Sequence, residues 1–227
     1  MSLMEDSLGT FLNKVSGTKN TTPAAGSVSA LAASLGISLV VLAGNLTIGR
    51  QKYMNLPEEV KKEIEESYEG ITSAGQRLQE LIDEDKRAYD QVISAFKRHK
   101  EGKTDLKEKE RELELADKGA LEVPLQIARE SLKALKLMEP LVKYGNPNCR
   151  ADLAVSIINL HAGLEGALAI AASNLNNLRE EEEKGRKYEE GEKLSLEAHR
   201  LKKELLGKLS LKLFYHYNQI NRGGNDI

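Results

Sequence analysis

Asp85 is the first residue of this sequence with a pattern that suits acid–base chemistry. It lies in the segment LIDEDKRAYDQV, close to the side of an expected helix that carries Leu81 and Ile82. A partly buried carboxylate either has a partner or has its pKa raised, and a carboxyl group with a raised pKa can serve as an acid or a base. The alternative for Asp85 is a surface salt bridge with Lys86 or Arg87.

Polar residues also gather at two helix starts. Asp152 follows the turn Gly145-Asn146-Pro147-Asn148, and Ser27 follows the segment PAAG. Each could be a site residue or could simply cap the helix that begins there. The spacing of the residues leaves both alternatives open.

Asn45 and Thr47 end a long uncharged segment, and the cations Arg50 and Lys52 and the aromatic Tyr53 follow directly. A polar and cationic cluster at this point suits an anionic ligand. An ordinary helix C-terminus is the alternative, because lysine and arginine there interact favourably with the helix dipole.

The sequence contains few of the motifs that metal or cofactor binding requires. Carboxylate-bridged metal sites in helical bundles use Glu-x-x-His pairs, and no histidine here has a glutamate three residues before it. His161 and Glu165 share a helix face, but such a pair is more often a buried hydrogen bond than a site. The single cysteine, Cys149, gives no zinc spacing, and no GxSxG, Walker or dinucleotide motif is present. We therefore expect no metal and no cofactor.

The uncharged segment from Thr21 to Gly49 is the element that must position these residues. As a helix it has a side of large residues and a side of small residues, and we expect the large side to fill the core and the small side to admit a close neighbour. Its length would also suit a transmembrane span. Dispersed serines and the absence of a basic flank favour a central helix of a soluble protein.

The remaining sequence predicts an all-α protein. Tryptophan is absent, aromatic residues are 4% of the 227 residues and β-branched runs are few. Helices are expected over about residues 3–15, 23–51, 57–99, 105–144 with a kink or break near Pro124, 151–175 and 194–213, with a solvated helical face or exposed turn over 179–192.

The second low-charge helix, from Ala151, alternates large and small residues as the first one does. Two such helices are expected to pack at the centre of a single-domain helical bundle over residues 4–220. Residues 1–3 look like an expression remnant, and residues 221–227 like a frayed tail.

Charge and cysteine content limit the partners. The 33 Lys and Arg residues nearly balance the 35 Asp and Glu residues, so we expect neither nucleic-acid binding nor membrane binding. One cysteine and no signal segment predict a reducing cytoplasm.

Four segments in collinear order resemble the formiminotetrahydrofolate cyclodeaminase and methenyltetrahydrofolate cyclohydrolase family. They are PAAGSVSALAASLGISLVVLAGNLTIGRQKY, DKRAYDQVISAF, KGALEVPLQIA and GNPNCRADLAVSIINLHAGLEGALAIAASNL, and they extend over roughly residues 8–175. The resemblance implies an all-helical homodimer with a folate cleft. It also implies cyclisation or hydrolysis at the one-carbon unit between N5 and N10 of tetrahydrofolate.

The resemblance also assigns the site. Asp85 and Asp152 would be the catalytic groups, one of them a base and the other a partner for the pterin ring. The substrate-binding residues would be Gly26, Ser27, Asn45, Thr47, Lys52, Tyr53, Gly145, Asn146 and Asn174. The family's Pro-Gly-Gly-Gly-Ser start reads Pro23-Ala24-Ala25-Gly26-Ser27 here, and its Ser-Asp pair reads Ala151-Asp152.

Three functions follow from this resemblance. The first is hydrolysis of 5,10-methenyltetrahydrofolate to 10-formyltetrahydrofolate. The second is cyclodeamination of formiminotetrahydrofolate, which releases ammonia and gives 5,10-methenyltetrahydrofolate. The third, motivated by the lost glycines and serine, is a folate-binding or scaffold protein without activity.

Overall fold

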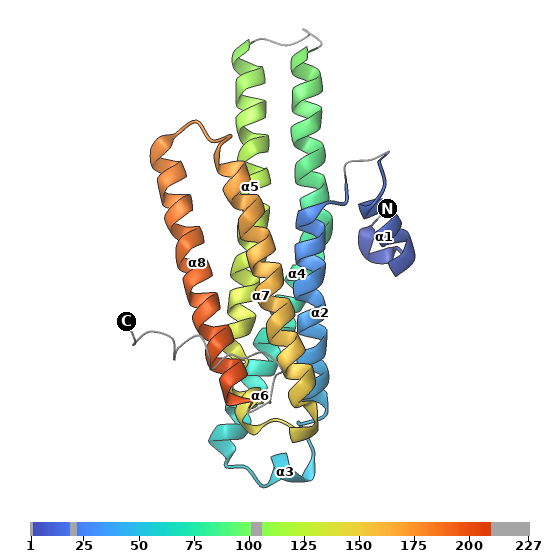
Figure 1. Ribbon diagram of the computed structural model, residues 1–227, viewed down its shortest axis with the longest axis vertical. Helices are drawn as coiled ribbons and strands as arrows, with labels where there is room; N and C mark the ends of the chain where they lie inside the picture. Colours follow the sequence, from blue (N-terminus) through green and yellow to red (C-terminus); the bar gives the residue numbers. More distant parts are fainter. Residues whose placement is uncertain (1, 19–21, 101–105, 210–227) are drawn as a thin grey trace, which may run out of the picture.

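The computed structural model describes residues 2–18, 22–100 and 106–209, and every regular element in these ranges is a helix (Figure 1). The all-α prediction is thereby confirmed for the described residues. The elements in chain order are η1 (Leu3–Glu5), α1 (Leu8–Val15), α2 (Ala25–Asn45), α3 (Gln51–Met54), α4 (Glu58–Lys100), α5 (Leu106–Leu137), α6 (Glu139–Tyr144), η2 (Pro147–Cys149), α7 (Arg150–Leu175) and α8 (Glu181–Lys208).

Helices α2 and α7 pack against each other along the bundle, with α4, α5 and α8 around them and α1 standing to one side (Figure 1). Their close approach needs glycine on both helices. A Cβ atom at Gly36 would lie 2.9 Å from the backbone oxygen of Ser156, and one at Gly163 would lie 2.6 Å from that of Ser29. The Ser156 hydroxyl also donates to the Gly36 carbonyl oxygen at 2.7 Å. The predicted pairing of the two low-charge helices is confirmed.

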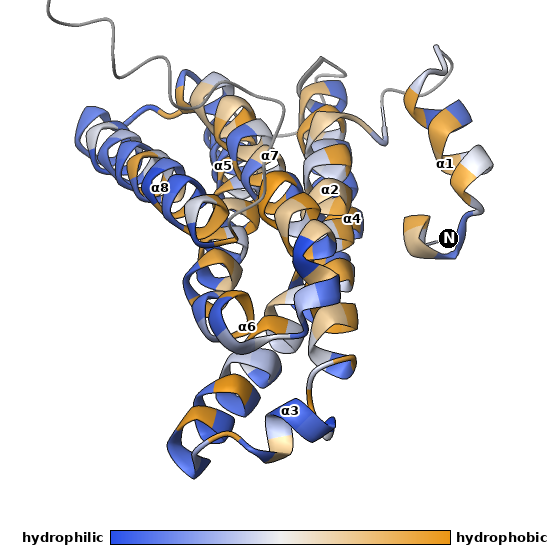
Figure 2. Cartoon of the chain, turned by 60° about the horizontal axis from the view of Figure 1, so that its bottom comes forward, coloured by the Kyte–Doolittle hydropathy of each residue, from blue (hydrophilic) through white to orange (hydrophobic). Residues whose placement is uncertain are grey.

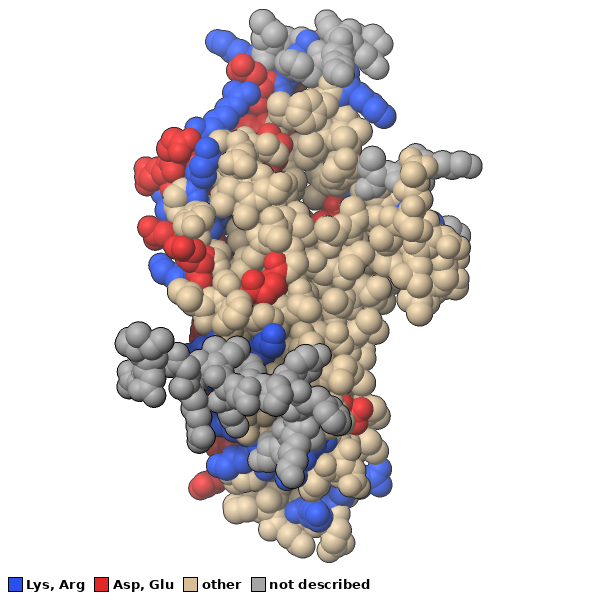
Figure 3. All heavy atoms as spheres, in the orientation of Figure 1, with Lys and Arg blue, Asp and Glu red and all other residues tan. Residues whose placement is uncertain are grey.

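The expected orientation of α2 was wrong. Its small side, including Ala30, Ala33 and Ser34, is buried, whereas Val28, Leu35 and Leu42 are 40%, 53% and 42% exposed. The reason is the short distance between the α2 and α7 backbones, which leaves no room for leucine between them. The large residues therefore form an uncharged outer face, which corresponds to the broad tan area beside α2 and α7 in Figure 3.

Helix α7 follows its prediction, because its large residues face the core. Leu153, Ile157, Leu160 and Leu164 are all buried. In Figure 2, α2 is coloured mainly as hydrophobic and α8 mainly as hydrophilic, in keeping with their central and outer positions.

Two segments are long and apolar enough to cross a membrane by length and composition, Ala25–Asn45 and Pro147–Leu175. Half of the most apolar window of each is buried inside the bundle. Packing of this kind also occurs in the core helices of soluble proteins, so the expectation of a soluble bundle stays a prediction.

Several helix boundaries differ from the sequence pattern. Helix α2 ends at Asn45, and residues 51–54 form the separate helix α3. Helix α5 continues through Pro124 and ends at Leu137, just before Pro140 in the first turn of α6. Buried Leu121 and Leu125 hold the chain helical across Pro124, although proline removes one backbone hydrogen bond.

Some predictions lie partly or wholly outside the described residues. These are the loop over 101–104 with the cap at Asp105, the end of the last helix near Leu213 and the tail over 221–227. At the other end, the expected remnant residues make contacts: Leu3 is buried, and its backbone N–H donates to Asp83 Oδ1 at 2.7 Å.

Candidate active site

The carboxylate of Asp85 lies at the N-terminus of α2, although Asp85 belongs to α4. Its Oδ2 accepts hydrogen bonds from the Ser27 backbone N–H at 2.8 Å and from Ser27 Oγ at 3.0 Å. The Ser27 hydroxyl also lies 2.9 Å from the backbone oxygen of Ile82. Because a helix N-terminus carries partial positive charge and unpaired N–H groups, it is a favourable place for a carboxylate.

Gly26 makes this arrangement possible. A Cβ atom at position 26 would overlap the Asp85 carboxylate, so only glycine lets the carboxylate approach the helix start. Ala24 is the N-cap residue of α2 and provides no side-chain hydrogen bond. Asp85 therefore supplies the acceptor that a serine or aspartate cap would otherwise provide.

Burial raises the pKa of Asp85 above its usual value, while the two hydrogen bonds from Ser27 act to lower the pKa. Burial disfavours the charged form of a carboxyl group, and donated hydrogen bonds favour it. A raised pKa of this kind is expected of a carboxylate that accepts a proton as a base and later releases it. The alternative of a surface salt bridge with Lys86 or Arg87 was wrong, since Lys86 pairs with Asp90 and Arg87 lies 4.0 Å from Glu84.

A second group of the predicted residues meets at the opposite end of α2. Thr47 Oγ1 accepts a hydrogen bond from the Asn146 backbone N–H at 2.9 Å and donates to the Ala43 oxygen at 2.7 Å. The Asn146 side chain donates to the Leu46 oxygen at 3.2 Å. These contacts join the predicted turn after α6 to the end of α2.

A pocket of about 250 Å³ lies at this junction. Its lining residues include Thr47, Lys52, Tyr53, Gly145 and Asn146. Arg50 contributes a second cation to the lining. Five predicted binding residues thus share one cavity with two positive charges, a composition that suits an anionic ligand.

Contacts from α4 hold two of the predicted residues in this region. The Tyr53 hydroxyl donates to Glu65 Oε1 at 2.5 Å, and this bond together with burial raises the pKa of Tyr53 to about 12. The Tyr68 hydroxyl donates to Asn45 Oδ1 at 2.8 Å. Glu65 and Tyr68 were not among the predicted site residues, because a contact between α4 and the end of α2 has no signal in local spacing.

The other two predicted residues lie on α7, near its opposite ends. Asp152 is in the first turn of α7 and is half-buried. Asn174 is in the last turn, where its amide donates to the Ala120 oxygen of α5 at 2.8 Å. In the described residues, Asn174 therefore supports the packing of α7 on α5.

Most of the predicted site residues consequently fall into two groups in one chain. The upper group is Gly26, Ser27 and Asp85, and the lower group is the pocket with Thr47 and Asn146. A helix rises about 1.5 Å per residue, so the length of α2 separates the two groups by about 30 Å. A ligand shorter than this separation cannot touch both groups of the same copy.

Comparison with known proteins identifies the family of this chain. The profile of the formiminotransferase-cyclodeaminase family matches residues 7–193. The chain belongs to this family. Family membership confirms the resemblance read from the four sequence segments.

Two relatives of the family illustrate its range. The methenyltetrahydrofolate cyclohydrolase of Methylorubrum extorquens is 30% identical over 162 residues, which cover 71% of this chain and 76% of that protein. The formimidoyltransferase-cyclodeaminase of Sus scrofa is 29% identical over 180 residues, or 79% of this chain. This chain spans only about a third of the length of the Sus scrofa protein, 32%.

The fold recurs in a solved structure. The formiminotetrahydrofolate cyclodeaminase of Thermotoga maritima superposes with a TM-score of 0.79 and 23% sequence identity. The match covers 92% of this chain and 98% of that chain. The helical bundle is therefore the fold of the family.

Proposed function

We propose that this family member hydrolyses 5,10-methenyltetrahydrofolate to 10-formyltetrahydrofolate, with Asp85 as the base. The observation that carries the proposal is the partly buried Asp85 carboxylate, which Ser27 holds at the start of α2 and whose pKa is raised. The relative from Methylorubrum extorquens, which is named as a cyclohydrolase, supports this reaction.

The reaction places clear demands on such a carboxylate. In methenyltetrahydrofolate the carbon between N5 and N10 shares a positive charge with both nitrogens, so a nearby negative group stabilises it. Asp85 accepts a proton from water as the water oxygen bonds to this carbon. It then gives that proton to N5 as the C–N5 bond breaks, while the hydroxyl proton leaves to solvent and the formyl group remains on N10.

The lower pocket suits the other end of the substrate. Folate carries an anionic glutamate tail, and the pocket presents Arg50 and Lys52 beside the Asn146 loop. A complete site needs the upper group and this pocket close together, which one copy does not provide.

We therefore propose that two copies pair through the outer face of α2. Exposed Val28, Leu35 and Leu42 recur every seven residues and carry no charge. An antiparallel pairing with its two-fold axis at Leu35 would place Val28 of one copy against Leu42 of the other. Asp85 of one copy would then lie near the Thr47 pocket of the other.

In this proposal Asp152 keeps its role as second carboxylate. It belongs to the lower end of the bundle, so it would approach the substrate from the copy that provides the pocket. We further propose that the dimer is soluble in the cytoplasm, binds no nucleic acid or membrane, and acts without a catalytic cofactor.

Cyclodeamination is the second candidate function, and the Sus scrofa relative named as a cyclodeaminase favours it. In that reaction N10 attacks the formimino carbon on N5 and ammonia leaves. The same carboxylate would accept the N10 proton and return one to the departing ammonia. An inactive folate-binding protein is the third alternative, motivated by Ala24 and Ala25 where the family pattern has glycine.

One experiment separates the three. Purified protein is added to methenyltetrahydrofolate, and loss of its chromophore is followed above the spontaneous rate, while ammonia release from formiminotetrahydrofolate is measured in parallel. We expect chromophore loss that falls at least about 100-fold in Asp85→Asn. Ammonia release alone would establish the deaminase, and folate binding without turnover of either substrate would establish an inactive protein.

A further inference from the structure

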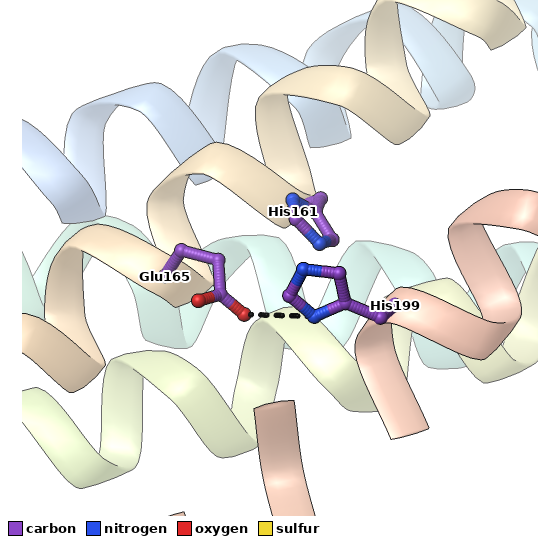
Figure 4. Close-up of side chains that lie close together, drawn as sticks. All are labelled: His161, Glu165 and His199. Carbon is purple, nitrogen blue, oxygen red and sulfur yellow. Dashed lines mark ion pairs between the residues drawn. The ribbon is translucent and has the colours of Figure 1, made fainter. Parts of the chain in front are cut away.

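Helices α7 and α8 bring three potential metal ligands together, away from the groups described above. His161 and Glu165 lie one turn apart on α7, and His199 faces them from α8, so that the three side chains converge (Figure 4). One ligand atom from each residue lies within 4.8 Å of the other two. The sequence showed only the pair on α7, because no local spacing links His199 to it.

His161 has a polar atom that lacks a partner. Its side chain is only 7% exposed, and Nε2 has no hydrogen-bond partner among the described residues. The other ring nitrogen, Nδ1, lies 3.5 Å from Lys202 Nζ. A buried nitrogen without a partner is unfavourable, and a metal ion would satisfy it.

The spacing of the remaining ligands suits zinc. Zinc takes histidine nitrogen and carboxylate oxygen at about 2.0–2.2 Å, so two ligands of a tetrahedral ion lie about 3.3 Å apart. Glu165 Oε1 and His199 Nδ1 are already 3.4 Å apart. The His161 and His199 rings meet edge to face with their centroids at 4.6 Å, and His199 Nδ1 also lies 3.0 Å from the Ser195 backbone oxygen. Metal binding therefore requires the His199 ring to turn from this oxygen toward the ion.

A pocket of about 300 Å³ borders the cluster, and Glu165 and Ser195 contribute to its wall. Ser195 Oγ donates to Glu165 Oε1 at 3.0 Å. Two histidines and one glutamate leave one position of a tetrahedral ion open, and water from the pocket can fill it.

We propose that His161, Glu165 and His199 form a binding site for a divalent transition metal of the zinc type, which fixes α8 to α7. Such a link would stabilise the packing of α8, because only Ala198 and Leu205 within this helix are buried. This metal site shares no residue with the upper and lower groups of predicted folate-binding residues, and it does not depend on the proposed reaction.

Lys202 lies where it would oppose metal binding at His161, so its replacement tests the site. A metal on Nε2 of His161 requires a hydrogen on Nδ1, which would then face the ammonium group of Lys202, and two donors cannot bond. The ammonium also repels a cation. Lys202 must therefore turn away when metal binds, and Lys202→Met should bind metal more tightly than the wild type.

The test is a titration of the full chain, without an affinity tag, with Zn²⁺ in a calorimeter and with Co²⁺ by visible absorption. The variants are His199→Gln, Glu165→Gln and Lys202→Met. We expect one Zn²⁺ per chain, a tetrahedral Co²⁺ spectrum and a higher Tm with Zn²⁺. Loss of either ligand should weaken binding at least about 10- to 100-fold, since even the partners of metal ligands matter that much.

His199 is exposed, so its replacement should leave the core intact. A loss of metal binding in His199→Gln would therefore report the loss of a ligand and not of the fold. The proposal fails if the wild type takes up no stoichiometric Zn²⁺, or if His199→Gln and Glu165→Gln bind it as tightly as the wild type. Weaker binding by Lys202→Met would equally contradict it. Circular dichroism of each variant verifies that the helices are intact.

Discussion

Asp85 Oδ2 accepts two hydrogen bonds from Ser27, one from the backbone N–H and one from the hydroxyl, although 58 residues separate them in the chain. This contact fixes α4 to the first turn of α2 and places a partly buried carboxylate where a helix favours negative charge. Most of the expected behaviour of the protein follows from it.

The first prediction concerns pH. An ionised Asp85 is needed as the base, so activity should rise as pH increases through its raised pKa. Ser27→Ala removes a hydrogen bond that lowers this pKa, and the midpoint of the acidic limb should move to higher pH. The rate of methenyltetrahydrofolate consumption, measured as a function of pH, gives the shift. If the midpoint does not move, the acidic limb does not report the ionisation of Asp85.

The same carboxyl group should affect folding. Its pKa is raised in the folded state, so the folded protein binds more protons between the unfolded and the folded pKa, and the free energy of unfolding should fall as pH rises through that window. Urea unfolding across the acidic range tests this dependence. In Asp85→Asn the fall should be smaller than in the wild type.

The second prediction concerns Gly26→Ala. The added methyl group overlaps the Asp85 carboxylate, which must move away from Ser27. We expect activity to drop about 10- to 100-fold, because small displacements of catalytic groups cost that much. Overpacking should also lower the free energy of unfolding by about 1–3 kcal/mol. Gly119→Ala on α5 is the matched control, since nothing lies within 4 Å of its new Cβ atom.

The third prediction concerns Thr47→Val. Valine has the shape of threonine but cannot accept the hydrogen bond from the Asn146 backbone N–H, so the loop beside the pocket loses its attachment. We expect a loss of about 1 kcal/mol in the free energy of unfolding. KM should rise with little change in kcat, because the pocket binds and does not react.

Thr72→Val is the control for Thr47→Val. Among the residues that the structure describes, the Thr72 hydroxyl bonds only to the Tyr68 oxygen of its own helix. An equal increase in KM for both variants would contradict a role for the Asn146 loop in substrate binding.

The fourth prediction concerns the outer face of α2. Leu35→Glu puts a charge at the proposed two-fold axis and should convert a dimer into monomers with little activity. Light scattering after size-exclusion chromatography measures the mass, and Leu196→Glu, at an exposed leucine of α8, is the control. A monomeric wild type would rule out the pairing.

A mixing experiment then tests whether the two copies share the site. Asp85→Asn and Lys52→Ala proteins are each expected to be impaired. If one copy supplies Asp85 and the other supplies Lys52, a mixed dimer contains one intact site, and co-refolding the two variants should restore part of the activity. A site within one copy would gain nothing from mixing.

The sequence by itself determined the helices and the family. Helices arise from local spacing and from turn residues such as those at positions 145–148, so the periodic segments matched α2, α4, α7 and most of α5. The contact between α2 and α7 was also predictable, because small residues on both helices allow a close approach. Asp85 was identified because its position conflicts with the apolar side of its helix.

Only the tertiary structure decided which side of α2 faces inward and where each site residue lies. The α7 backbone comes so near Gly36 that the small side must be inside and Leu35 outside. Likewise, α2 holds Asp85 and Thr47 at opposite ends, and α8 adds His199 to His161. The physical reason is that local periodicity sets the faces of one helix, whereas contacts between helices distant in the chain depend on how all the faces pack together.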